Sequence, residues 1–195
     1  MTEAHQKIVE ALFGAIREGE FLYAILDAAR NIDIAFQLQN IPNVEYVSLY
    51  KGRKEEPMWD AAPYLVRCVR DSEFFNWAVE RGWGDSWGIF LTSKANLEDV
   101  CKHFQEFLMV KTEEDREVYF RFYDPRVLRV FLPTCTSDEA KQIFGLVSHF
   151  LVEADNRETL LKFTPKAQGL TQQTLNLSSQ ARTDVEGSVF QSRII

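Results

Sequence analysis

The chain has 195 residues, which is the size of one domain at the usual scale of roughly 100 to 200 residues. Its 46% hydrophobic and 26% charged residues are typical of a globular protein and exclude general disorder or a coiled-coil rod. The formal net charge of -7 would repel a phosphate backbone, so we expect no nucleic-acid partner.

The sequence also indicates where the protein works. It contains no run of about 18 apolar residues, so we expect no membrane insertion. Glu3 and His5 stand where a secretion signal would carry positive charge and an apolar block, and we therefore expect a cytoplasmic protein. Cys68, Cys101 and Cys135 are widely spaced, which predicts free thiols rather than disulfides or a zinc site.

Hydrophobic patterning predicts alternating helices and strands in the first half of the chain. The residues of 8–16 have helical spacing, whereas 21–26 is an unbroken apolar run, closed by Asp27, of the kind found in strands buried on both faces. The further predicted elements are a helix over 28–39, a strand over 45–50, a strand over 64–69, a helix over 73–81 and a strand over 89–92. This order predicts an α/β fold, a single compact domain with a mixed sheet flanked by helices.

Cap residues mark the helices of the second half. Asn96 is a good N-cap for a helix that follows it, and Asp124 with Pro125 provides an N-cap and a first helical residue for another. We expect Leu128, Val130 and Phe131 to form the buried side of that helix. The remaining predictions are a hairpin of 109–111 with 118–123, a helix capped by Thr136 or Ser137 that reaches Gly145, and closing strands over 148–153 and 160–163.

The composition changes near residue 164. We predict a folded domain over 1–164 and a flexible polar tail over 165–195, because Phe190 is the only aromatic residue of that segment. Alternatively, the segment docks on a partner through Val189-Phe190 and Ile194-Ile195.

Catalytic motifs are missing from the sequence. It contains no GxSxG, GxxxxGK[ST] or HExxH pattern and no GxGxxG pattern after a strand. His5, His103 and His149 are far apart, so we expect no metal and no cofactor. Asp27, at the end of a buried strand, and Asp124 are the best catalytic candidates. We favour capping roles for both, with Arg121 and Arg126 as possible charged partners of Asp124.

The four tryptophans lie at positions 59, 77, 83 and 87. Core packing is one interpretation of this group. Trp59 and Trp83, however, lie in segments marked by proline or glycine, where exposed aromatic side chains are typical anchors for a partner protein. We therefore keep an interaction surface as an equal alternative.

A series of short segments resembles a known family. The segments are 23–28 (YAILDA), 48–50 (SLY) with Gly52, 62–66 (APYLV), 87–88 (WG), 120–128 (FRFYDPRVL) and 144–145 (FG). Their order and spacing resemble the type VI secretion system effector adaptor, or chaperone, family, long catalogued only as a domain of unknown function. The resemblance extends from about residue 21 to residue 145, and 120–128 is its most specific part.

The resemblance implies a non-enzymatic cytoplasmic adaptor. Such proteins bind an effector, often through its PAAR-containing or hydrophobic N-terminal region, and help to load it onto the VgrG spike protein. Many members have an additional C-terminal lobe, whereas here only the polar segment 165–195 follows the predicted domain.

Two hypotheses about sites follow from the residues and the resemblance together. Trp59 and Trp83 contribute to the client surface, and a structural corner consists of Arg121, Tyr123, Asp124 and Arg126. Two other functions remain open, namely an immunity protein that binds a toxin and a small hydrolase that uses Asp27 and Asp124.

Overall fold

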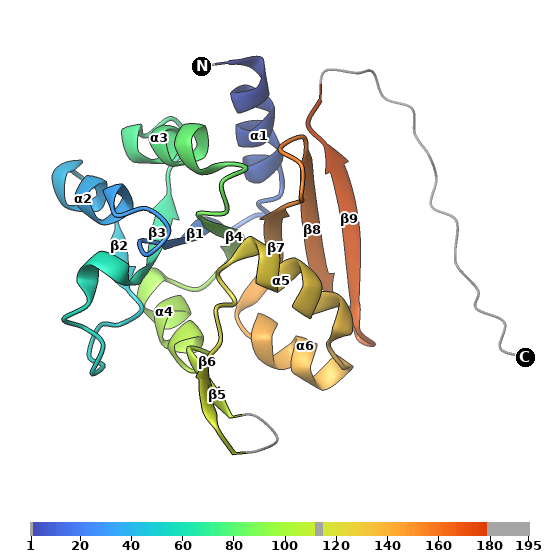
Figure 1. Ribbon diagram of the computed structural model, residues 1–195. Coiled ribbons are helices and arrows are strands. Elements are labelled where there is room, and N and C mark those ends of the chain that lie inside the picture. Colours follow the sequence, from blue (N-terminus) through green and yellow to red (C-terminus); the bar gives the residue numbers. More distant parts are fainter. Residues whose placement is uncertain (1, 112–114, 179–195) are drawn as a thin grey trace, which may run out of the picture.

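The computed structural model describes residues 2–111 and 115–178. Seven of its strands form one sheet: β1 Phe21–Asp27, β2 Tyr46–Ser48, β3 Pro63–Cys68, β4 Gly88–Ser93, β7 Val147–Glu153, β8 Thr159–Pro165 and β9 Leu170–Asn176. The spatial order is β2-β3-β1-β4-β7-β8-β9 (Figure 1). A separate hairpin pairs β5, Met109–Lys111, with β6, Glu117–Tyr119.

Helices cover both faces of this sheet, which confirms the α/β fold class. They are α1 Glu3–Gly14, α2 Asp33–Asn40, α3 Glu73–Gly82, α4 Leu97–Gln105, α5 Pro125–Phe131 and α6 Ser137–Phe144. Figure 1 shows α1 and α3 on one side of the sheet and α4 and α6 on the other. The interior strand β1 is therefore buried on both faces, which explains its unbroken apolar run.

The pairing within the sheet differs from the predicted mixed arrangement. Each ladder of the described residues is antiparallel, including both ladders of β1, with β3 and with β4. A mixed sheet would include parallel pairs, but the burial of β1 on both faces depends on the helical layers and not on strand direction.

Cap residues fix most helix starts as predicted. The side chains of Asn96, Asp124 and Thr136 accept hydrogen bonds from backbone N–H groups in the first turns of α4, α5 and α6. The helix predicted over 28–39 is present, but its predicted start is wrong: α2 begins at Asp33, so Asp27 is not its N-cap. The Ala28 N–H instead donates to the Ala62 carbonyl at 3.1 Å, which keeps the chain beside β3 after β1 ends.

Two predictions about the α5 region are also corrected. The strand predicted over 118–123 is confined to β6, and the chain turns before Asp124 begins the helix. Leu128 is fully buried, but Val130 is 66% exposed because it lies on the outer side of α5.

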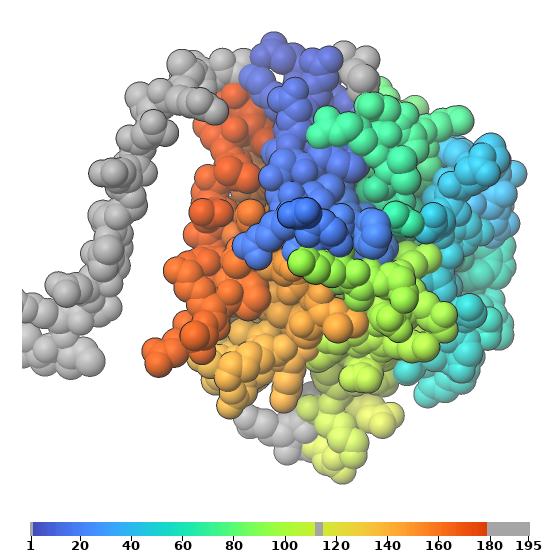
Figure 2. Space-filling model, turned by 180° about the vertical axis from the view of Figure 1, so that it is seen from behind, coloured from blue at the N-terminus to red at the C-terminus, as the bar shows by residue number. Residues whose placement is uncertain are grey.

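The sheet continues beyond the predicted domain boundary at residue 164. Strand β9 pairs with β8 from Leu170 to Asn176, so a flexible tail beginning at residue 165 is wrong for 165–178. Figure 2 shows this last strand at the rim of the molecule, beside α1. Its composition is polar because five of its seven residues are exposed. The rest of the predicted tail, with its possible docking residues, lies outside the described residues.

Candidate functional site

Asp27 lies at the end of β1 with a side chain that is only 2% exposed. It accepts a hydrogen bond from the Ala29 N–H at 3.0 Å and forms an ion pair with the guanidinium of Arg121. Burial raises the pKa of Asp27 above its ordinary value, although the hydrogen bond and charge of Arg121 act in the opposite direction. The ion pair joins β1 to the segment that leads into α5.

Asp124 is the N-cap of α5, and Pro125 is at the start of the helix. Its carboxylate accepts from the Arg126 N–H and from Nε, both at 2.9 Å, and from Nη2 at 2.6 Å. Burial alone would raise the pKa of Asp124, but these bonds from Arg126 outweigh burial and hold it below its ordinary value. Arg126 is therefore the partner of Asp124, and Arg121 is the partner of Asp27.

Two tyrosines complete this cluster. Tyr123 and Tyr50 are 4% and 7% exposed and share a hydrogen bond between their side chains. Burial and the nearby Asp27 carboxylate raise the pKa of both phenols. Tyr50 follows β2, and sequence reasoning gave it no role because no local pattern connects it with Tyr123. We call the following set the ionic corner: Asp27, Tyr50, Arg121, Tyr123, Asp124 and Arg126.

The geometry of the ionic corner favours a structural role over catalysis. A general acid or base needs access to the proton that it transfers. Asp27 and Asp124 are 2% and 4% exposed at their side chains, and an arginine already pairs with each carboxylate. Removing one partner of a buried pair costs about 3 to 5 kcal/mol, because the other charge stays behind. The corner therefore fixes the start of α5 against the central sheet.

An exposed cluster of apolar side chains surrounds Trp59. Trp59 is 40% exposed and begins the short 3-10 helix Trp59–Ala61. Its ring packs edge to face against Phe36 of α2, with centroids 5.8 Å apart. Phe36 is 45% exposed, and Ile32 lies one helical turn before it. We call the following set the apolar patch: Ile32, Phe36, Met58 and Trp59.

Trp83 does not belong to this patch. It is 8% exposed, and its Nε1 donates to the Arg157 carbonyl at 2.9 Å, so the prediction that it is an exposed anchor is wrong. The loop that carries it folds onto the end of β7. There the buried Glu153 carboxylate accepts from the N–H groups of Gly84 at 2.5 Å and Ser86 at 2.9 Å. Glycine spacing indicated a loop but gave no sign of this buried acceptor.

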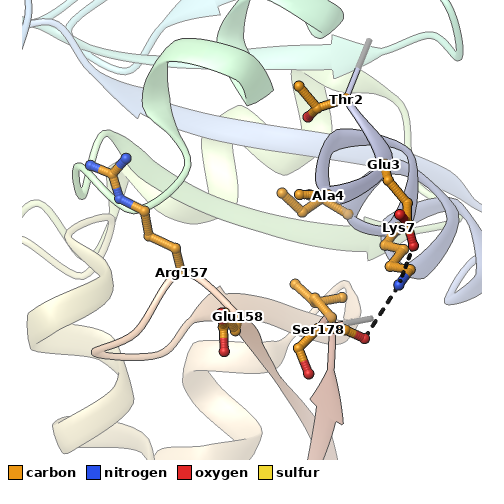
Figure 3. A pocket seen from close by; sticks show the side chains of 9 residues that line it. Thr2, Glu3, Ala4, Lys7, Arg157, Glu158 and Ser178 are labelled. Atoms are coloured by element: carbon orange, nitrogen blue, oxygen red, sulfur yellow. Dashed lines mark hydrogen bonds and ion pairs between the residues drawn. The ribbon is translucent and has the colours of Figure 1, made fainter. Parts of the chain in front are cut away.

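A pocket of about 360 Å³ lies between the start of α1, the turn that leads into β8 and the residues that follow β9. Figure 3 shows Lys7 and Arg157 at opposite sides of it. Lys7 donates to the Ser178 carbonyl at 3.3 Å and pairs with Glu3, while Arg157 pairs with Asp85. The two basic side chains are thus already engaged by neighbouring groups.

The histidines occupy separate parts of the described chain. His5 contacts Asn76, His103 contacts the Ile143 carbonyl, and His149 contacts the Thr164 hydroxyl. Within residues 2–111 and 115–178, no group of three or more His, Cys, Asp or Glu side chains could hold a metal ion. None of the helices in this part of the chain is long and apolar enough to cross a membrane.

Comparison with known proteins places the chain in a family. No curated protein and no solved structure matches it. Residues 22–142, which include both acidic members of the ionic corner and the apolar patch, match the family model described as a domain of unknown function, DUF4123. Because this match covers more than half of the sequence, the chain belongs to the DUF4123 family.

Proposed function

We propose that this protein is a non-enzymatic adaptor that binds a type VI secretion effector in the bacterial cytoplasm and promotes its loading onto the VgrG/PAAR spike. The observation that carries the proposal is the series of motifs through which the sequence resembles the type VI adaptor family, above all 120–128. These motifs lie almost entirely within the DUF4123 match.

The ionic corner is consistent with this function. The segment 120–128 is where the corner is built, and its charged side chains are engaged in capping and ion pairs. We therefore assign the motif a structural role in the fold. Because its charged side chains already bind one another, we assign client binding to another surface.

The apolar patch is the surface that we assign to the client. Phe36 and Trp59 present two aromatic rings at the surface, and Met58 beside them is 53% exposed. Aromatic side chains on a rigid scaffold contribute most of the binding energy in many interfaces. A hydrophobic N-terminal region of an effector would bury these rings without the need for charged partners.

An affinity purification from the native cytoplasm tests the proposal. The tagged chain should retain a PAAR-containing effector or VgrG, identified by mass spectrometry. The variant Phe36→Ala, Trp59→Ala should retain at least about tenfold less, because two anchors are lost. The matched control is the double variant Val69→Ala, Val130→Ala, which truncates two exposed apolar side chains elsewhere on the surface. It should retain as much effector or VgrG as the wild-type chain does. Thermal unfolding of each variant verifies that it is folded.

Three other experimental results would contradict the adaptor proposal. An immunity protein would bind the catalytic domain of a toxin and block its toxicity in co-expression, whereas an adaptor would bind outside that domain and leave toxicity intact. A hydrolase would lose turnover in a folded Asp27→Asn variant. Recovery of neither an effector nor a spike protein by the wild-type chain would refute the proposal.

A further inference from the structure

A groove of about 410 Å³ lies between the edge strand β2 and helix α4. β2 and β9 are the two edge strands of the sheet that the described residues form, so this groove is at the opposite edge from β9 (Figure 1). The groove is distinct from the apolar patch, since no residue of the patch lines it. It combines an open strand edge with a helix wall, an arrangement in which proteins bind extended peptides by adding a strand.

The hydrogen-bond pattern of β2 leaves backbone groups available at this edge. The Glu45 carbonyl accepts from the Arg67 N–H at 2.9 Å, and the Leu49 N–H donates to the Pro63 carbonyl at 2.9 Å. Residues 45, 47 and 49 therefore bond to β3. Because alternate residues of an antiparallel strand bond to opposite sides, the N–H and C=O of Tyr46 and the N–H of Ser48 point to the open edge.

The side chains of the groove combine an apolar floor with a basic rim. Val47 and Leu97 are half-buried and Cys101 is buried, so together they can receive an apolar side chain. Lys51 is exposed and has no ion-pair partner among the described residues, whereas Lys102 pairs with Glu98 at 3.1 Å. The rim is thus locally positive on a chain whose formal net charge is -7.

We infer that this groove binds an extended, acidic segment of a partner protein. The segment would pair with the outward groups of Tyr46 and Ser48, insert an apolar side chain over Val47 and Leu97, and place an Asp or Glu carboxylate near Lys51. This inference rests on the groove alone and does not require the type VI assignment.

A second copy of the chain fits the groove less well. Strand β2 has only three residues, so self-pairing of two β2 strands would bury far less than the roughly 1,200 Å² of a stable interface. Two copies of net charge -7 would also repel each other, whereas the positive rim attracts an acidic segment.

Selection from a phage-displayed library of random decapeptides tests the inference with the full chain as target. The enriched peptides should share acidic and β-branched residues. A synthetic enriched peptide should bind about tenfold more weakly to Lys51→Glu and more weakly at higher salt, because the carboxylate loses its partner. Lys166→Glu makes the same charge change on an exposed residue between β8 and β9 and should leave the affinity unchanged.

The position of the bound peptide distinguishes strand addition from other binding. In amide hydrogen exchange, the peptide should protect the N–H groups of Tyr46 and Ser48. The inference is overturned by a selection without binders, by peptides that lack acidic residues, by protection elsewhere, or by equal effects of the two charge variants. A dimer of the free chain that Lys51→Glu dissociates would also overturn it, in favour of a second copy.

Discussion

Replacement of Arg121 by alanine tests whether the ionic corner stabilises the fold. The variant Arg121→Ala removes the ion-pair partner of the Asp27 carboxylate, and the Asp27 side chain is only 2% exposed. An uncompensated buried charge costs about 3 to 5 kcal/mol. Because the Arg121 side chain is 43% exposed, water can enter the space that it leaves, and we expect the lower end, about 3 kcal/mol.

The pH dependence of this loss has a definite sign. Without Arg121, only the hydrogen bond from the Ala29 N–H still lowers the pKa of Asp27, while burial and the nearby Asp124 charge raise it, so its native pKa lies still further above the unfolded value of about 3.9. As the pH falls from 7 towards 4, native Asp27 takes up its proton before the unfolded chain does, which favours the native state. The stability difference between wild type and Arg121→Ala should therefore shrink as the pH falls.

Urea unfolding at pH 7 and at lower pH measures both effects. In the Asp27→Asn background, which removes the buried charge, Arg121→Ala should cost less than about 1 kcal/mol. A loss of about 3 kcal/mol at pH 7 corresponds to a melting temperature lower by about 6 to 12 °C for a chain of this size. Equal losses in both backgrounds, or a loss that does not change with pH, would refute the assignment of the stabilisation to this pair.

Variants at three further positions test other contacts. Asp124→Ala removes the cap of α5 and the partner of Arg126 and should cost about 2 kcal/mol in urea unfolding at pH 7. Since the pKa of Asp124 is lowered on folding, this contribution should be present above about pH 3.9 and be lost as the pH falls through the lower native pKa. Gly84→Ala should lower the melting temperature, because Gly84 has a φ of +85° and its new Cβ would lie 2.2 Å from Arg157 Cγ. Thr136→Ala removes the capping box of α6 and should cost about 1 kcal/mol, whereas Thr136→Ser should cost less.

Local signals predicted the helices and strands better than they predicted the sheet. Asn96 and Asp124 mark helix starts because the cap interaction involves only neighbouring residues. β9 was missed because an edge strand with five exposed residues needs little apolar sequence, and its stability comes from pairing with β8. The antiparallel order was missed for a related reason, since strand direction depends on long connections that periodicity does not encode.

Local sequence signals also failed to predict which distant residues meet in the candidate sites. The sequence placed Asp124 and Arg126 together because they are two residues apart, but the pair of Asp27 and Arg121 joins residues 94 positions apart. Trp59 and Trp83 looked equivalent in sequence. They differ in the fold because the loop that carries Trp83 binds the buried carboxylate of Glu153. The ring of Trp59 instead remains at the surface beside α2.

The ionic corner and the groove share the segment that follows β2. Tyr50 shares its hydrogen bond with Tyr123 of the corner, while the Gln105 side chain of α4 donates to the carbonyls of Leu49 at 3.0 Å and Lys51 at 2.9 Å. The backbone of Lys51 is thus fixed from one side by the corner and from the other by the helix that forms the groove wall. A lysine held in this way loses less conformational freedom when it meets a carboxylate than one on a free loop would. The motif that stabilises the fold therefore also orders one wall of the groove, so its residues can be essential for binding without touching the partner.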